Sequence, residues 1–364
     1  MAQPHSVHCQ WYWRSFNRVT GDASSGLAIG GSTAIDLPTY RAGSVFSDIP
    51  FAAVHDVQLG AVSSGRVRDY HDYAATELAA AVGHCDLFLC FERRAHPSTT
   101  ALLRALKPKR SIGLLPGFDI EIPFDRKPHA IDLAFAIAME LAEDLRIEDF
   151  AAPPRLPHAA LALARKLRGD LPREAVLLVV HADTKPDKAW PRAKLAQALD
   201  EFLERHRQVV AIVVGTDAFE VDVGRNRGRI LSCHGVPLSV AFAVIGVCDL
   251  FLGIDSCMLH LADLYQVPGV GLFGTTDPSE FGFRFARHLH VRAATMNEIS
   301  VADVGDALEA RFGTLYFRTT ELYRAKLERV RACEGRYALD RAAFRRLYRP
   351  PQAVCPCVHQ WMES

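Results

Sequence analysis

The sequence lacks any long hydrophobic segment. None of its 364 residues lies in a stretch close to the ~18 consecutive apolar residues that a membrane-spanning helix needs. Its first residues, with His5, His8 and Arg14 among other polar ones, lack the apolar region of a signal peptide. We therefore expect no transmembrane segment and a cytoplasmic location.

The sequence also has no net charge. Lys and Arg together number 42, as do Asp and Glu. No overall field attracts the chain to nucleic acid or to an anionic membrane, so nucleic acid is not an expected partner. A charged ligand would have to be bound by a local site.

The nine cysteines form no recognisable framework. Cys85, Cys90 and Cys248 lie in apolar segments, which favours reduced, buried thiols over disulfides. A second group lies near the C-terminus and contains Cys333, Cys355, Cys357 and His359. These residues could form a metal site or could be loosely packed. Their spacing matches no zinc pattern of the Cys-x2-Cys type, so no metal ligand is predicted.

The length predicts two domains, each with alternating strands and helices. In the first domain, residues 1–150, strands are expected at 51–57, 85–91 and 110–115, and helices at 73–82, 98–106 and 130–145. Residues 151–157 contain three prolines, which disfavour both helix and strand, and are interpreted as the linker.

The second domain, residues 158–312, is expected to be a parallel sheet covered by helices. Its uninterrupted apolar runs, 176–180 and 209–214, suit strands that are buried on both faces. The expected strands are 175–181, 209–215, 250–253 and 269–273, and the expected helices are 191–205, 238–247 and 257–265. Residues 313–364 are predicted to be a helical extension.

Ligands of parallel sheets bind beyond the carboxyl ends of the strands, and three loops leave the second domain there. The first carries Thr184 and Lys188, which could bind a phosphate; the alternative is that its lysines are solvated loop charges. The second carries Glu220, which could accept ribose hydroxyls or could simply be part of an acidic surface turn.

The third loop directly precedes a helix. Asp255 or Ser256 could cap that helix, but a helix start also attracts phosphate. His260 lies one turn along the same helix, where a packed histidine is the usual interpretation. Gly274 and Thr275, at the end of the next strand, add N–H and hydroxyl donors. Together these residues predict a pocket for a polar ligand such as a nucleotide sugar.

Three ordered motifs resemble the donor half of the heptosyltransferases, glycosyltransferase family 9. They are Asp-Thr-Lys-Pro-Asp-Lys-Ala-Trp-Pro at 183–191, Gly-Ile-Asp-Ser-x-x-x-His-Leu-Ala at 253–262 and Pro-x-Val-x-Leu-Phe-Gly-Thr-Thr-Asp-Pro at 268–278. The resemblance covers about residues 175–285 and implies a GT-B fold of two facing Rossmann-like domains. It also implies an inverting mechanism without a metal or other cofactor, and a donor such as ADP-heptose.

The resemblance assigns roles to individual residues. Thr184 and Lys188 would bind the diphosphate, Glu220 the ribose and Leu238 the base. The sugar and phosphates would be bound by Asp255, Ser256 and His260. The full expected donor site is Asp183, Thr184, Lys188, Glu220, Leu238, Asp255, Ser256, Cys257, His260, Gly274 and Thr275. Cys257 is a departure, because the family usually has glycine after the Asp-Ser pair, and a side chain there crowds the site.

The catalytic base is less evident from the sequence. An inverting transfer needs a group that removes the acceptor proton, and the family has a carboxylate after an early Ile-Gly pair. Here Gly31 occupies that position. The candidates that could replace it are Asp22, Asp36, Asp119 and Glu121. Of these we select Asp36 and Asp119, with Lys188 stabilising the leaving diphosphate.

The predicted function is therefore transfer of a heptose-like sugar to an acceptor hydroxyl. The alternative is a non-catalytic partner protein that retains a sugar-nucleotide pocket, and a sugar-nucleotide epimerase or hydrolase is a third reading. Lipopolysaccharide core is the commonest acceptor in the family. The altered first domain makes a protein side chain or a small natural product equally reasonable acceptors.

Overall fold

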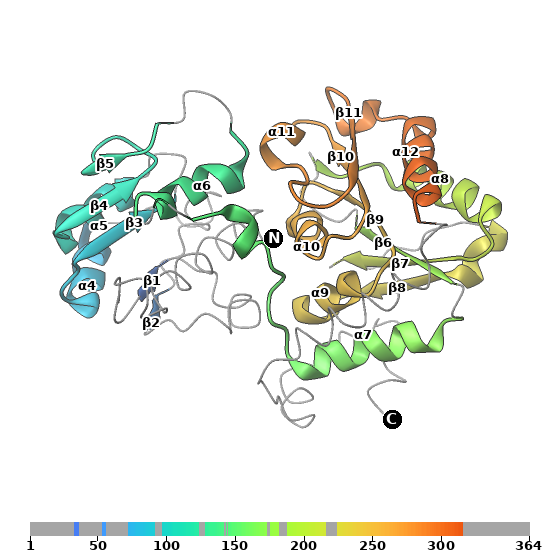
Figure 1. Cartoon of the computed structure of the whole chain (residues 1–364), viewed down its shortest axis with the longest axis horizontal. Coiled ribbons are helices and arrows are strands. Elements are labelled where there is room, and N and C mark those ends of the chain that lie inside the picture. Colours follow the sequence, from blue (N-terminus) through green and yellow to red (C-terminus); the bar gives the residue numbers. More distant parts are fainter. Residues whose placement is uncertain are drawn as a thin grey trace. The chain divides into compact units, whose positions relative to one another are not determined.

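The structure is a computed structural model that describes residues 33–35, 53–55, 72–91, 97–123, 128–141, 143, 145–172, 175–181, 188–215 and 224–315. The chain divides between Ala151 and Ala152 into two compact units. Each unit is α/β, as the alternating sequence pattern predicts (Figure 1). The predicted helical extension beyond residue 315 lies outside the described residues.

The N-terminal unit contains short parallel strands and helices. Its elements are β1 (Thr33–Ile35), β2 (Ala53–His55), α4 (Asp72–Val82), β3 (Leu87–Cys90), α5 (Pro97–Leu106), β4 (Arg110–Gly113), β5 (Ile120–Glu121), α6 (Ala130–Met139) and a 3-10 turn, η2 (Ile147–Phe150). Strands β3, β4 and β5 form one parallel sheet, and β1 pairs with β2 in another.

Helices cover both faces of the β3–β4–β5 sheet. Leu87 and Leu89 pack in one cluster with Leu133 and Ile137 of α6. Phe88, which lies between them in sequence, packs instead with residues of α4 and α5. This alternation follows from the two-residue period of a strand. It gives the unit two separate apolar layers.

Helix α6 ends earlier than predicted. Apolar residues at helical spacing suggested a helix to residue 145, but α6 ends at Met139 and Glu140 is its C-cap. The next residues include Glu143 and Asp144. Negative side chains are unfavourable at the negative end of a helix, so the helix stops before they enter it.

The C-terminal unit is built on one larger sheet. Its elements are α7 (His158–Asp170), β6 (Val176–His181), α8 (Arg192–Arg205), β7 (Val209–Gly215), η4 (Gly224–Arg229), β8 (Ile230–His234), α9 (Leu238–Gly246), β9 (Leu250–Ile254), α10 (Cys257–Leu264), β10 (Gly269–Phe273), α11 (Pro278–Phe281), β11 (His288–Arg292), η5 (Met296–Glu298) and α12 (Val301–Gly313). The strand order is β11-β10-β9-β6-β7-β8, and all neighbours are parallel.

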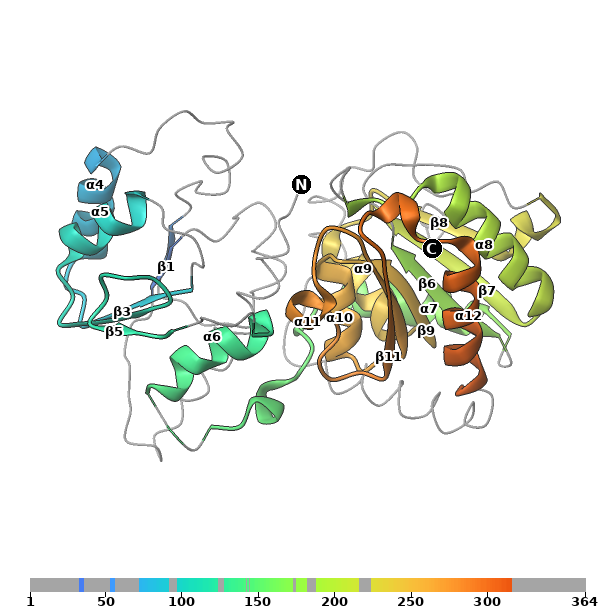
Figure 2. The ribbon, with the colours of Figure 1, turned by 90° about the horizontal axis from the view of Figure 1, so that it is seen from above.

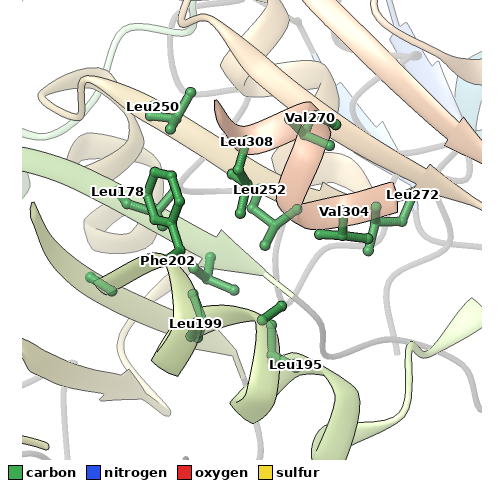
Figure 3. Packing of buried hydrophobic residues seen from close by; sticks show 14 of the residues in the cluster. Leu178, Leu195, Leu199, Phe202, Leu250, Leu252, Val270, Leu272, Val304 and Leu308 are labelled. Carbon is green, nitrogen blue, oxygen red and sulfur yellow. The ribbon is translucent and has the colours of Figure 1, made fainter. Parts of the chain in front are cut away.

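The apolar core of this unit lies between the sheet and helices α8 and α12. Alternate residues of β6 and β9, such as Leu178 and Leu252, point toward Phe202 of α8 and Leu308 of α12 (Figure 3). Helices α9 and α10 cover the opposite face (Figure 2). Strands β6, β9 and β10 are buried along their whole length, which is why their sequences are continuously apolar.

Candidate donor-binding site

The strand order creates a natural ligand site in the C-terminal unit. The chain runs from β6 outward through β7 to β8, then returns to β9 on the other side of β6 and continues to β10 and β11. The strand that follows β6 in the chain and the strand that follows β9 therefore lie on opposite sides of the β6–β9 pair. Ligands of open parallel sheets bind at such a switch point, beyond the carboxyl ends of the strands.

Lys188 and Asp255 meet at this switch point. Lys188 follows β6 and Asp255 directly follows β9, and Nζ of the lysine lies 2.5 Å from Oδ2 of the aspartate. The aspartate side chain is 2% exposed and the lysine 14%. The lysine is therefore no solvated loop charge, because it forms a largely buried ion pair.

Ser256 occupies the N-cap position of α10 without acting as a side-chain cap. Its side chain makes no capping hydrogen bond, whereas its carbonyl accepts the N–H of Leu259 at 3.2 Å. Among the described residues, neither Oγ of Ser256 nor Oδ1 of Asp255 has a hydrogen-bond partner, although both atoms are buried. The capping interpretation is therefore wrong for the serine hydroxyl, which leaves it available to a ligand at a helix start.

His260 lies beside the same carboxylate. It is one turn along α10, its side chain is 1% exposed, and its Nε2 is 3.9 Å from Oδ1 of Asp255. This distance is too long for a hydrogen bond, but it brings a titratable ring next to a buried charge. The structure thus brings Lys188, Asp255, Ser256 and His260 together.

Gly274 and Thr275 follow β10 at the same edge of the sheet. Gly274 is buried, and a Cβ on it would lie 2.6 Å from the backbone nitrogen of Met296. Its lack of a side chain therefore serves packing between two backbone segments. Thr275 is exposed and keeps its hydroxyl accessible to solvent or to a ligand.

One segment contacts residues on both sides of the site, and no motif in the sequence indicated it. Residues 295–300 pack against Gly274 on one side. On the other side, the indole Nε1 of Trp190 donates to the carbonyl of Ile299 at 3.3 Å, and Trp190 is only two residues from Lys188. Lys194 adds a hydrogen bond to the same carbonyl at 2.9 Å. The segment therefore connects the residues next to Lys188 with the turn after β10.

Leu238 and Cys257 begin the helices that follow β8 and β9. Leu238 is half-buried at the start of α9, after a turn in which the N–H of Gly235 donates to the carbonyl of Gly215 at 2.9 Å. Gly235 has a φ of +67°, a left-handed conformation that glycine adopts readily. Cys257 is half-buried at the first position of α10.

Several expected residues lie outside the described part of the chain. They are Asp22, Asp36, Asp183, Thr184 and Glu220.

Asp119 is described and has a clear structural role. Its Oδ2 accepts hydrogen bonds from the N–H of Ser111 at 2.7 Å and from its hydroxyl at 2.8 Å. Glu121 likewise accepts the N–H of Gly117 at 2.7 Å. These bonds fix the loop between β4 and β5, so a catalytic function of Asp119 stays a prediction.

In the described part of the chain, no cluster of three or more His, Cys, Asp or Glu side chains is arranged to bind a metal. In the same residues, no helix combines the length and apolarity needed to cross a bilayer. The tail cysteines and His359 lie beyond this region.

Comparison with known proteins connects this site to a family. A family model described as glycosyltransferase family 9 (heptosyltransferase) matches residues 96–304. No curated protein matches the chain.

Solved structures of that family share its fold. A glycosyl transferase family 9 protein from Veillonella parvula DSM 2008 aligns with a TM-score of 0.64 at 15% identity, covering 85% of this chain and 94% of that one. The E. coli ADP-heptose lps heptosyltransferase II aligns with a TM-score of 0.55 at 13% identity, covering 84% and 94%. E. coli heptosyltransferase WaaC with ADP-2-deoxy-2-fluoro heptose aligns with a TM-score of 0.56 at 13% identity, covering 84% and 96%.

These alignments cover most of both chains in each case and show that the fold is GT-B, built from Rossmann-like domains. The family match includes both partners of the Lys188–Asp255 ion pair, Ser256, His260 and the turn after β10. Since that match spans more than half of its residues, the chain belongs to glycosyltransferase family 9, a membership that supports a function in sugar transfer.

Proposed function

We propose that the protein is an inverting glycosyltransferase that uses an ADP-heptose-type donor. The observation that carries the proposal is the Lys188–Asp255 ion pair, which lies at the switch point of the sheet next to the buried, unpaired hydroxyl of Ser256. A cation, a helix start and a hydroxyl beyond parallel strands suit a diphosphate.

The donor assignment also draws on related proteins. The E. coli relatives are described as an ADP-heptose heptosyltransferase and as a heptosyltransferase with ADP. We infer the same class of donor here. Lys188 would bind the diphosphate, and together with the start of α10 it would stabilise the negative charge that grows on the leaving ADP.

A metal is not required by this mechanism. The cation and the helix start would supply the positive potential that a metal ion provides in other transferases. We therefore propose that sugar transfer does not need a metal ion. Transfer that continues in the presence of EDTA would support this.

The acceptor must lose a proton to a base during transfer. We propose Asp36 as this base, because Oδ2 of Asp119 already binds Ser111. Asp36→Asn should abolish transfer while ADP-heptose still binds. Asp119→Asn should instead lower stability, since it weakens the bonds that fix the loop after β4.

The test is an assay of ADP release from ADP-heptose with a panel of acceptors. The panel should include lipopolysaccharide core, peptides with hydroxyl side chains and small polyhydroxylated molecules. ADP release that depends on one acceptor supports a transferase and identifies the acceptor class. Absence of both ADP release and ADP-heptose binding would refute the proposal.

A second function is favoured by Gly31, which replaces the carboxylate that the family has after its early Ile-Gly pair. A chain that lost its base could keep the donor pocket and act as a non-catalytic partner protein. ADP-heptose binding without turnover, together with no effect of Asp36→Asn, would support this function. ADP release without any acceptor would indicate a hydrolase. The cytoplasmic location stays a prediction.

A further inference from the structure

The donor site contains three titratable groups in a row, and their charges are mutually dependent. Asp255 lies between Lys188, 2.5 Å from its Oδ2, and His260, 3.9 Å from its Oδ1. The aspartate and histidine side chains are 2% and 1% exposed. At such depth, a change in the charge of one group strongly alters the free energy of ionising the others.

Few ionisable residues lie on the described elements that pack against the helix of His260. Helix α10 packs against α9, β9 and β10, and none of these three elements contains a titratable residue. On α10 itself the other titratable residues are Cys257 and Asp263. The Asp263 carboxylate accepts the N–H groups of Arg284, Phe285 and Ala286 at 2.7–2.8 Å. His181, on neighbouring β6, has its Nδ1 3.1 Å from the carbonyl of Val214.

A donor changes this balance of charge. Without ligand, the positive charge of Lys188 neutralises the buried Asp255 carboxylate. The donor diphosphate brings two negative charges that compete for the same ammonium group. A buried carboxylate that loses its cation is strongly unfavourable, and a proton bound by the adjacent imidazole supplies a compensating positive charge.

We propose that binding of the nucleotide-sugar donor is coupled to uptake of one proton by the Asp255–His260 pair. The proton comes from solvent, and the pair then carries one positive charge more than before binding. The proposal rests on the function proposed above, because it needs a diphosphate at Lys188. It adds that Asp255 positions the lysine in the free protein and releases it to the donor.

Proton uptake has a measurable consequence for affinity. If one proton binds with the donor, the association constant rises about tenfold for each unit of decreasing pH within the range where the pair titrates. A diphosphate diester is the suitable probe, because it lacks the second phosphate pKa of about 6 that free ADP has. ADP-heptose without acceptor meets this requirement.

The experiment is calorimetric titration of the full-length protein with ADP-heptose at one pH in two buffers of different protonation enthalpy. We expect the measured enthalpies to differ by an amount that corresponds to about one proton taken up. We also expect the dissociation constant to fall as pH decreases. Equal enthalpies in both buffers with a constant dissociation constant would overturn the proposal, although donor binding itself would stand.

Variants test whether the proton that is taken up binds to the Asp255–His260 pair. Asp255→Asn removes the charge and nearly preserves the shape, so proton uptake should fall close to zero while ADP-heptose still binds. Lys166→Met, on the exposed side of α7, is the matched control and should leave uptake unchanged. Unchanged uptake in Asp255→Asn would overturn the assignment. If that variant does not fold, calorimetry of the wild-type protein in two buffers and over a pH series still tests whether donor binding takes up a proton. A complete lack of ADP-heptose binding would refute the proposed function and this inference together.

Discussion

At the scale of single residues, the candidate donor site contains a lysine that forms an ion pair with a buried carboxylate. Lys188 extends from a loop, yet only 14% of its side chain is exposed because Asp255 holds its ammonium group. The sequence motifs predicted both residues as ligands of the donor. They could not predict the ion pair between them, because the pairing depends on how the loops after β6 and β9 meet.

Replacement of Lys188 by Met tests its contact with the diphosphate. We expect ADP-heptose affinity to fall at least tenfold, because a charge-assisted hydrogen bond to phosphate contributes about 1.5–3 kcal/mol. Titration calorimetry measures the affinity, and thermal unfolding measures stability in parallel. Lys166→Met is the control and should bind like wild type. A loss of stability without a loss of affinity would identify Lys188 as a structural lysine.

The cysteines should differ in reactivity according to burial. Cys233 is 2% exposed, and burial raises the pKa of its thiol to about 12. Because the thiolate is the reactive form, Cys233 should resist iodoacetamide at pH 8 until the protein unfolds. Half-buried Cys257 should be labelled earlier and be protected by ADP-heptose. Peptide mass spectrometry over a time course checks both rates, and equal labelling of the two thiols in the folded protein would contradict the prediction.

At the scale of elements, the buried strands of the C-terminal sheet were predictable and its two edge strands were not. Strands β6, β7, β9 and β10 have continuous apolar sequences, and the structure confirms all four. Strands β8 and β11 lie at the two edges of the sheet and contain serine, histidine or arginine. A strand with one open edge needs fewer apolar residues, so this sequence signal is weak.

The turn after β10 should tolerate no side chain at its first residue. Gly274→Ala would place a Cβ 2.6 Å from the backbone nitrogen of Met296, so the two segments must separate. Overpacking of this kind costs about 1–3 kcal/mol. Chemical denaturation measures the loss, and ADP-heptose affinity should fall as well.

Gly169 provides the matched control for that substitution. It lies near the end of α7, and a Cβ there meets no atom within 4 Å. Gly169→Ala should therefore be neutral or stabilise the protein by up to about 1 kcal/mol, because alanine favours helix more than glycine does. A greater loss of stability in Gly169→Ala than in Gly274→Ala would show that the cost of replacing glycine depends on backbone conformation and not on the contact of the new Cβ.

At the scale of the whole molecule, the sequence predicted the α/β class better than it predicted the catalytic residues. The three prolines at 151–157 lie next to the division between Ala151 and Ala152. Helix α7 was not predicted, because it follows these prolines directly and its alanines, arginines and lysine give a weak apolar pattern. No carboxylate could be assigned as a catalytic base from the sequence, because no single motif in the first half of the chain specifies one.

Because each unit has its own apolar core, we expect two thermal unfolding transitions. Phe202 is fully buried between the sheet and α12 and packs edge-on against Phe312. Phe202→Ala should destabilise the C-terminal unit by about 3–5 kcal/mol and lower one transition. Phe135→Ala, a matched change on α6, should lower the other. Differential scanning calorimetry distinguishes them, and a single transition lowered by both variants would contradict independent cores.

The segment at residues 295–300 has a consequence for how mutational data on this protein should be interpreted. It accepts a hydrogen bond from Trp190, two residues after Lys188, and it packs on Gly274. It therefore fixes the spacing between these two parts of the candidate donor site. Substitutions at Met296 and Ile299 will shift that spacing and lower activity. A mutational scan that ranks positions by lost activity alone will therefore group Met296 and Ile299 with the ligand-binding residues. A parallel measurement of the amount of folded protein is needed to distinguish residues that support the site from residues that bind the ligand.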